Sequence, residues 1–485
     1  MRLRRRCNVR RLLAALTFVA VAFISLHAAR AAGAAQVVKA PPPKEIDYDK
    51  LIQEATDFLS KYIRINTTNP PGNEMEAAKF LKEKFLSEGI PANTWEPEPG
   101  RGILVARLRG LGEKKKALIL QTHMDVVPAN ASEWKVPPFS GEVKEGAIWG
   151  RGAADDKGPS VIAMMAMLAI KRAGILLDRD ILFIATGDEE VGGRIGAEWF
   201  TEHEKDIYAD AGYVLNMDAG GIVVLPDGKK FYSVDVTEKT PLWLKLTTTG
   251  TEGHASAPPA QTSVTRLIGA LARVIDYHPQ IRVLGPVQDQ FRTIAELEHG
   301  PAQYLDLAAS LRDAAYAREF LADPGHNAAV RDTIAPTVLA AGFKTNVLPQ
   351  VATAEIDCRL LPGDSQKQFL ATIGKLINDK EVKIDVLLQS PSATSPSKSL
   401  LMTAIEKLAR IEDKAPAVPA MSGGFTDSRF FRAQNLVTYS FTPIEYTPGK
   451  AIGVHGIDEH IEIKPMGEAI QRMVKLLEIF GGKEK

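Results

Sequence analysis

Short apolar runs in this sequence lead directly into acidic and polar residues whose types suit metal chemistry. Three runs end in this way: 117–120, 181–185 and 213–215. The side chains that follow them are His123, Asp125, Glu189, Glu190 and Asp218. A further acidic pair, Asp155 and Asp156, stands just before a helical stretch. Imidazole and carboxylate groups bind divalent metal ions and can also transfer protons.

The spacing within each cluster has both a chemical and an ordinary explanation. His123 and Asp125 are two residues apart at a strand end, so their side chains point to the same side, and the carboxylate could orient a ligand imidazole. Alone, His123 could equally be a core histidine beside a turn aspartate. Glu189-Glu190 alone could be a solvated loop. Asp155 and its neighbour alone could simply favour the positive end of a helix.

The coincidence of four such clusters favours a metal site. Because no cysteine stands among them, we expect zinc first, with manganese or cobalt as alternatives. Several carboxylates with histidines suit two ions about 3.5–4 Å apart that share a bridging carboxylate. Such a site activates a water and polarises a carbonyl group, and a glutamate that is not a ligand takes the proton.

The elements that must position these residues form an α/β fold. Apolar runs that alternate with helical stretches are typical of buried parallel strands, and in open sheets of this kind the ligand site lies beyond the carboxyl ends of the strands. Apolar residues at helical spacing predict helices over 48–63, 74–87 and 160–173, and a last helix over 465–480.

From about residue 239 the pattern changes to β-α-β-β-α-β, the order of a ferredoxin-like domain. An insertion of about 55 residues, which we expect to be helical, separates its first helix from its second strand. After Gln389 the sequence again looks like the first part. We therefore predict an α/β domain over 48–238 and 390–485, interrupted by an α+β lid over 239–389.

The first 31 residues have the parts of a secretory signal. Six arginines lie within residues 2–11, an apolar run covers 12–26, and Ala29-Arg30-Ala31 is a cleavage pattern. We expect cleavage near Ala31, a Pro-rich tether over 32–47, and a protein that is periplasmic or secreted. An uncleaved membrane anchor is the alternative, although the apolar run is short for one.

The composition of the whole chain excludes several classes of protein. Hydrophobic residues make up 45% and charged residues 24% of the 485 residues, which excludes disordered, collagenous and coiled-coil chains. The 59 Lys and Arg residues balance 59 Asp and Glu residues, so no positive surplus supports a nucleic-acid partner. Two cysteines cannot form a disulfide framework.

Six segments, in order, resemble the co-catalytic zinc metallopeptidases of family M20: THMDVVP, GRGAADDKG, TGDEEVGG, NMDAGG, GTEGHASAP and HGIDEHIEI. The resemblance runs from about residue 48 to 480. It implies a catalytic domain with a mixed, mainly parallel sheet and an inserted lid that serves dimerisation. It also implies five ligands for two metal ions: His123, Asp155, Glu190, Asp218 and His455.

The resemblance assigns further roles residue by residue. Asp155 matches the bridging carboxylate, Glu189 the general base, and Asp125 the carboxylate that orients the histidine. A shift of one residue would put Ala219 in place of Asp218, but alanine cannot bind a metal. His254, in a Gly-flanked turn of the lid, matches a histidine that stabilises the oxyanion, often across a subunit boundary; alone it could be a surface histidine.

Three residues resemble those that hold the substrate carboxylate: Asn346, Arg359 and Arg429. Arginine suits that task because its fork of N–H groups matches a carboxylate, although each arginine could equally be a surface ion-pair partner. Phe425, in GGFTDSRFF, departs from the commoner pattern of the family and puts the role of Arg429 in doubt.

We therefore expect an enzyme that hydrolyses the amide bond of a peptide or N-acyl amino acid next to a free carboxylate. The exposed edge of the lid sheet could pair two copies into a homodimer. A deacylase or desuccinylase of a small metabolite is an alternative, which the export segment disfavours. A binding protein that has kept the fold without catalysis is a remote alternative.

Overall fold

The computed structural model describes residues 42–112, 115–447 and 452–482. The chain divides into two units, Met1–Pro43 and Lys44–Lys485, and every described helix and strand belongs to the second unit. The predicted signal peptide, 1–31, lies outside the described residues. Within the described part of the chain, no helix combines the length and the apolar composition that crossing a membrane requires.

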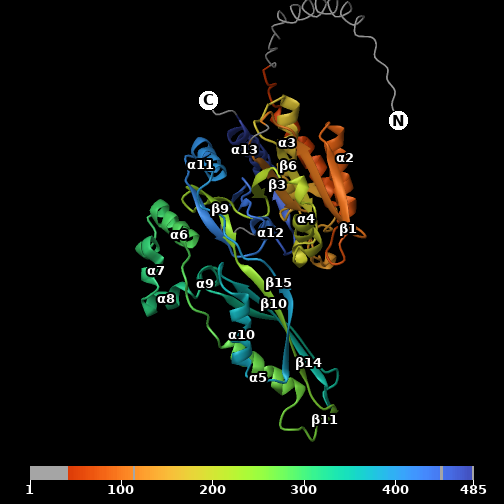
Figure 1. Ribbon diagram of the computed structural model, residues 1–485, viewed down its shortest axis with the longest axis vertical. Helices are drawn as coiled ribbons and strands as arrows, with labels where there is room; N and C mark the ends of the chain where they lie inside the picture. Colours follow the sequence, from red (N-terminus) through yellow and green to blue (C-terminus); the bar gives the residue numbers. More distant parts are fainter. Residues whose placement is uncertain (1–41, 113–114, 448–451, 483–485) are drawn as a thin grey trace, which may run out of the picture. The chain divides into compact units, whose positions relative to one another are not determined.

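A mixed sheet of ten strands forms the main body of this unit (Figure 1). Its central strands run parallel in the order β6 (Ile181–Thr186), β3 (Ala117–His123), β7 (Ala211–Asn216) and β17 (Val437–Ser440). On one side follow the antiparallel strands β2 (Arg101–Leu108) and β1 (Ala92–Glu98). On the other side lie β9 (Lys230–Glu238), β8 (Gly221–Val224), β18 (Glu445–Tyr446) and β16 (Ala417–Ser422).

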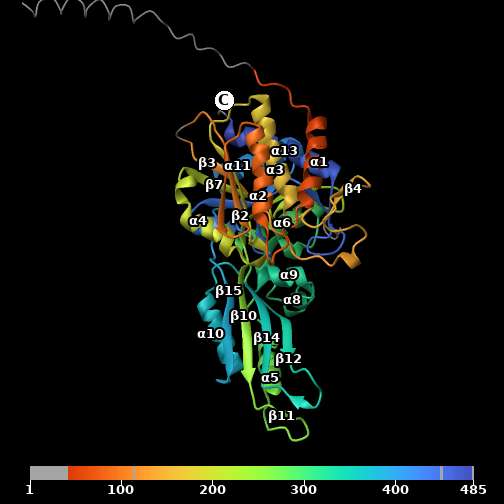
Figure 2. The same cartoon turned by 90° about the vertical axis from the view of Figure 1, so that its right-hand side faces the viewer.

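The central strands are buried on both faces. Leu118 and Leu120 of β3 point into one core cluster, whereas Ile119 points into another. The larger cluster lies under five helices: α1 (Tyr48–Ile63), α2 (Glu74–Ser87), α3 (Lys157–Ala173), α11 (Leu400–Glu412) and α13 (Ile463–Gly481). The smaller one lies under α4 (Trp199–His203) and α12 (Ser428–Ala433), on the other side of the sheet (Figure 2). Burial on both faces explains why these strands are continuous apolar runs.

A second, antiparallel sheet follows β9 directly along the chain. Its strand order is β12 (Thr333–Ala341), β14 (Val351–Leu360), β10 (Thr240–Thr249) and β15 (Val382–Gln389). Helices α5 (Ser263–Ile275) and α10 (Gln366–Ile377) share its apolar core. This is the β-α-β-β-α-β order of a ferredoxin-like arrangement, as predicted.

The insertion between α5 and β12 is helical, as expected from the sequence. It consists of α6 (Gly285–Glu298), α7 (Leu307–Ser310), α8 (Ala314–Phe320) and α9 (Pro324–Val330), joined by a short 3-10 helix. Val287 and Phe291 of α6 share a core cluster with Met421 of the main sheet and with Leu361, which follows β14. The insertion therefore packs against both sheets.

Candidate metal centre and active site

Strand order brings the predicted site residues to one edge of the main sheet. His123 is the last residue of β3 and pairs with Thr186, the last residue of β6. The turn that carries Glu189 and Glu190 follows β6, and Asp218 follows the end of β7, the other neighbour of β3. Since the three strands are parallel, their carboxyl ends meet at the same edge.

Asp155 lies between two histidines that are distant in sequence. Its Oδ1 is 3.0 Å from Nε2 of His123, and its Oδ2 is 3.2 Å from Nε2 of His455. The same nitrogen of His455 is 3.1 Å from Oε2 of Glu190, and Nε2 of His123 is 3.8 Å from Oδ1 of Asp218. All five predicted ligands therefore lie within one cluster.

The donor set of this cluster fits divalent cations. Two groups of three side chains each bring their ligand atoms within 4.8 Å of one another: His123 with Asp155 and Glu190, and His123 with Glu189 and Asp218. Burial raises the pKa of Asp218 to about 7 and that of Glu190 to about 7. Hydrogen bonds with Asp155 and Glu190 raise the pKa of His455 to about 10. The cluster thus concentrates negative charge in a buried place, which a metal cation would compensate.

Asp125 connects the histidine to the glutamate turn. Its Oδ1 lies 3.4 Å from Nδ1 of His123 and accepts a hydrogen bond from the backbone N–H of Glu189 at 3.1 Å. Its Oδ2 accepts from the N–H of Glu190 at 3.1 Å and from Nδ2 of Asn69 at 2.8 Å. Nδ1 of His123 also lies 3.0 Å from the backbone carbonyl of Asp125. This fully buried residue therefore contacts the imidazole and holds the turn.

Glu189 has the environment of a proton carrier. Its side chain is buried, and its Oε1 has no hydrogen-bond partner among the described residues. Burial raises the pKa of Glu189 well above its ordinary range. The nearest cation is the guanidinium of Arg429, with Nη1 3.9 Å from Oε1. A carboxylate in such a site accepts and returns a proton readily.

The two predicted substrate arginines have different surroundings. Arg429 is only 1% exposed and donates from Nη2 to the carbonyl of Gly192 at 2.9 Å and from Nη1 to the carbonyl of Thr426. Arg359 is partly exposed, and its Nε and Nη2 donate to Asp357 at 2.8 and 2.9 Å. Each guanidinium carbon lies 4.6 Å from the ring centroid of Phe425. Arg429 therefore braces the loop after Glu190, whereas Arg359 keeps an exposed part.

The structure does not bring His254 and Asn346 to the cluster within one chain. His254 ends β11 (Gly253–His254), which pairs with β13 (Val347–Leu348), and the carbonyl of Asn346 accepts from the N–H of Ala255 at 3.1 Å. Both lie at the end of the second sheet that is remote from the main sheet, beyond the ten residues of β10 (Figures 1 and 2). Ten extended residues span about 33 Å, too far for a side chain to bridge.

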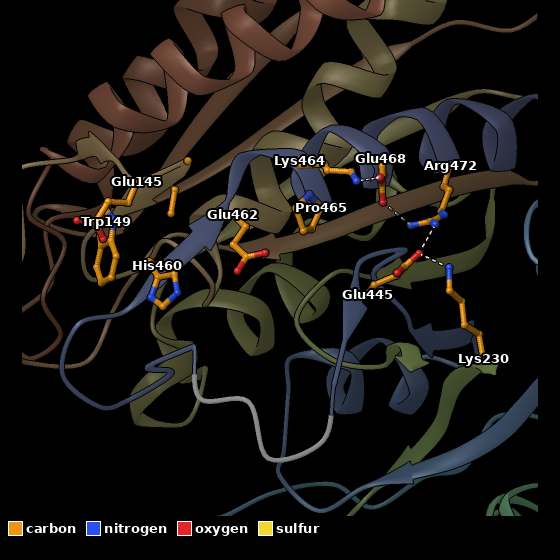
Figure 3. Close-up of a pocket in the computed structure, with 12 residues that line it drawn as sticks. Glu145, Trp149, Lys230, Glu445, His460, Glu462, Lys464, Pro465, Glu468 and Arg472 are labelled. Carbon is orange, nitrogen blue, oxygen red and sulfur yellow. Dashed lines mark hydrogen bonds and ion pairs between the residues drawn. The ribbon is translucent and has the colours of Figure 1, made fainter. Parts of the chain in front are cut away.

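A separate pocket of about 680 Å³ lies between α13 and two small strands, β5 (Ala147–Trp149) and β19 (His460–Glu462). None of the predicted site residues lines this pocket. Its cations already have partners, because Lys230 lies 2.7 Å from Glu445 and Arg472 also donates to Glu445 (Figure 3). The metal cluster, and not this pocket, is therefore the candidate active site.

Several buried residues that contact the loops of the site were not predicted from the sequence. Glu74 is fully buried and accepts two hydrogen bonds from Arg101, which also donates to Asp188 at 2.8 Å. Asp188 stands inside the segment TGDEEVGG, so its position in the sequence could have indicated this support. No pattern in the sequence marks Arg101 or Asn69.

Two histidines around one carboxylate, at the carboxyl edge of an α/β sheet, form an arrangement suited to metal-assisted hydrolysis. Comparison with known proteins identifies the class. Residues 119–479 match the model of "Peptidase family M20/M25/M40", so the chain belongs to this family. It is 30% identical over 381 residues to the human N-fatty-acyl-amino acid synthase/hydrolase PM20D1, with 76% of this chain and 75% of that protein covered.

Other relatives agree with this class. The chain is 30% identical over 444 residues to the probable carboxypeptidase S-like 2 of Dictyostelium discoideum, which covers 89% of this chain and 82% of that protein. The metallo-carboxypeptidase Sso-CP2 from Sulfolobus solfataricus has the same fold, with a TM-score of 0.71, 20% identity, and coverage of 89% and 99% of the two chains. The chain is thus an M20 hydrolase that acts on amide bonds of the peptide or N-acyl amino acid type.

Proposed function

We propose that this protein is an exported two-metal hydrolase that cleaves the amide bond of peptides or N-acyl amino acids next to a free carboxylate. The observation that carries the proposal is the carboxylate of Asp155, which turns one oxygen to His123 and the other to His455. A carboxylate placed in this way is suited to bridging two ions.

The ligands divide into two sets that share Asp155. His123 and Asp218 would complete the ligand set of one ion, and Glu190 and His455 that of the other. Zinc is the first candidate for both ions, with manganese and cobalt as alternatives. When bound, the ions supply Lewis acidity toward a water molecule and toward the scissile carbonyl.

Glu189 would take the proton from the attacking water and return it to the leaving amine. Its buried carboxylate with a free Oε1 supports both steps, because the raised pKa favours the protonated form between them. Asp125 holds the backbone of the turn in which Glu189 stands, and Arg429 holds the carbonyl of Gly192 just beyond it. These two residues would therefore keep the base in place.

The substrate carboxylate would bind Arg359, whose side chain stays partly exposed beside its bonds to Asp357. Asn346 and His254 would reach the active site of the partner subunit of a homodimer. Within one chain they lie at β11 and its partner β13, and β11 is at the end of the second sheet remote from the main sheet (Figure 1). The surface that would pair the copies is apolar: Ile268 and Ile275 of α5 are 60% and 53% exposed, and Leu339 of β12 is 67% exposed. We keep 239–389 as the proposed lid and dimerisation segment.

N-acyl amino acids are proposed as substrates on the same footing as peptides. The relatives include enzymes named for N-fatty-acyl-amino acids and others named aminoacylase-1 and carboxypeptidase S-like. Both substrate kinds present an amide next to a carboxylate, which is the feature that the site recognises in this proposal. A deacylase of a small biosynthetic metabolite remains the alternative, which export would disfavour.

The decisive experiment compares the wild-type protein with a Glu189→Gln variant. Metal content and hydrolysis would be measured on a library of dipeptides and N-acyl amino acids, each also offered with its carboxylate amidated. We expect the variant to retain both ions and to lose at least about 100-fold in kcat, since general-base catalysis contributes about 10²–10⁴-fold. Equal turnover by the two proteins would contradict the role of Glu189, and equal cleavage of amidated substrates would contradict carboxylate recognition.

Export is tested separately. The Arg-rich and apolar segment 1–31 supports it. Expression of the full chain should give a mature protein that begins near residue 32 outside the cytoplasm, and deletion of 1–31 should retain the protein inside. An intact N-terminus on membrane-bound protein would favour the uncleaved anchor.

A further inference from the structure

A buried carboxylate that is not among the proposed ligands joins the two loops that carry Asp155 and His455. Glu459 is fully buried and stands four residues after His455. Its Oε1 accepts hydrogen bonds from the backbone N–H groups of Ala154 at 2.9 Å and of Asp155 at 3.1 Å. The carboxylate of Glu459 therefore holds the main chain of the proposed bridging residue.

Arg151 completes the connection from the other side. Its Nη1 donates to Oε2 of Glu459 at 2.6 Å, and its Nη2 donates to the carbonyl of Gly456 at 2.8 Å. Gly456 is the residue next to His455. The side chain of Arg151 is only 3% exposed, so this ion pair is shielded from water. One pair of side chains thus contacts the backbone of Asp155 on one loop and the residue after His455 on the other.

The loop that carries His455 needs such support, because its backbone conformation is unfavourable. His455 and Asp458 have φ values of 56° and 58°, in the left-handed region that side chains with a Cβ rarely adopt. Gly453 has a φ of 77°, and a Cβ there would lie 2.7 Å from the Cα of Glu459. Contacts with the rest of the protein must therefore maintain this conformation.

We propose that Arg151 and Glu459 are positioning residues that set the distance between Asp155 and His455, and thereby the affinity for the ion that these two side chains share. The inference rests on the proposed two-metal function. Outer partners that fix the orientation of ligands change metal affinity by about 10–100-fold in other sites. The other ion would share Asp155 but would also be held by His123 and Asp218. Those two residues are supported by Asp125 and the ends of β3 and β7, so the affinity for this ion should fall less.

The first test is a Glu459→Gln variant of the full chain. A glutamine has one acceptor oxygen in place of two. If that oxygen accepts from the backbone N–H groups of Ala154 and Asp155, the NH₂ group points at Arg151, which is itself a donor. We expect wild-type protein to bind two Zn²⁺ ions, and the variant to bind one of them about 10–100-fold more weakly and the other with a clearly smaller loss of affinity. Competition with a fluorescent zinc chelator would measure both affinities, and the absorption spectrum of the Co²⁺-loaded protein would report which geometry changes.

The matched control is Asp180→Asn. Asp180 also accepts from an arginine and from a backbone N–H, those of Arg107 and Gly110, both at 2.8 Å, but it lies at the amino end of β6, away from the cluster. This variant should lower the unfolding temperature of the metal-free protein and leave both zinc affinities unchanged. Arg151→Lys is the milder second variant. It keeps the positive charge but loses the second guanidinium nitrogen, which donates to the carbonyl of Gly456, and it should weaken binding of the same ion.

Three results would overturn the inference. The first is that Glu459→Gln and Arg151→Lys bind both ions with the affinity of the wild-type protein. The second is that both variants lose affinity for the two ions by the same factor. The third is a wild-type protein that binds fewer than two ions, which would contradict the proposed function as well. The first two results contradict only the role of Arg151 and Glu459, because the wild-type protein would still bind two ions.

Discussion

The guanidinium carbon of Arg359, on the second sheet, lies 4.6 Å from the ring centroid of Phe425, which belongs to the loop between β16 and α12 of the main sheet. The ring of Trp243, on β10, is 6.2 Å from the same ring. Phe425 thus contacts two side chains of the second sheet, and its ring also lies beside Arg429 of α12. Phe425, which departs from the family pattern, therefore has a structural role: its ring contacts the guanidinium groups of Arg359 and Arg429.

Replacement of Phe425 should therefore impair substrate binding. A cation–π contact of this kind contributes about 1 kcal/mol, so Phe425→Ala should raise KM for substrates with a free carboxylate about 5-fold through a less ordered Arg359. Steady-state kinetics would measure this, with Phe425→Tyr as the control that keeps the aromatic face. A fall in kcat with unchanged KM would instead point to disturbance of Arg429 and the base.

Asp125→Asn should reduce metal binding and activity together. The amide offers one acceptor oxygen in place of the two that hold Asn69 and the N–H groups of the glutamate turn. We expect zinc affinity at the His123 side to fall by about 10–100-fold. Titration with a zinc chelator would measure it. Unchanged affinity with reduced kcat would show that Asp125 serves the turn alone.

Removal of metal should lower stability as well as activity. Without cations the buried carboxylates of the cluster repel one another, and burial already raises the pKa of Asp218 and Glu190 to about 7. Zinc at 100 times its dissociation constant should stabilise the folded state by about 2.7 kcal/mol. Thermal unfolding of chelator-treated protein, before and after zinc is restored, would measure the effect. An unchanged unfolding temperature would count against a metal in this cluster.

The thiol of Cys358 should be unreactive in the folded protein. Burial raises its pKa from an ordinary 9.0 to about 12, so the nucleophilic thiolate is scarce at pH 8. Iodoacetamide at pH 8 should label Cys358 only after unfolding in urea, as peptide mapping would show. Since the folded state retains this proton longer than the unfolded state, the same shift lowers stability as pH rises from about 9 toward 12. Rapid labelling of the native protein would contradict this burial.

Much of the fold follows from patterns that local physics dictates. Helices predicted over 48–63 and 74–87 coincide with α1 and α2, because their apolar spacing and ends are local properties. The helix predicted from residue 160 begins earlier, at Lys157, because a proline is compatible with a first helical turn and does not delay the start. The proximity of His123, Glu189 and Asp218 was predictable because parallel strands bring their carboxyl ends together.

The parts that could not be predicted depend on contacts between distant segments. Glu459 and Asp155 are separated by 304 residues, and no pattern near either one indicates their hydrogen bond. Arg429 matched a substrate arginine in the sequence, but its burial against the carbonyl of Gly192 depends on how α12 packs. His254 was predicted in a Gly-flanked turn, but it ends the short strand β11 just before a turn. Its distance from the cluster follows from the length of β10.

The second sheet leaves and rejoins the main body at neighbouring points. Thr240 begins β10 directly after β9, and Leu242 pairs with Gln389, the last residue of β15. The intervening chain therefore closes on itself, much as an inserted module does when its two ends are adjacent. In evolutionary terms, such a module can be lost, exchanged or enlarged without rethreading the sheet that carries the proposed metal ligands. The helices α6–α9 occupy the connection between α5 and β12, where added length disturbs neither the strand pairing nor the edge that carries the candidate site.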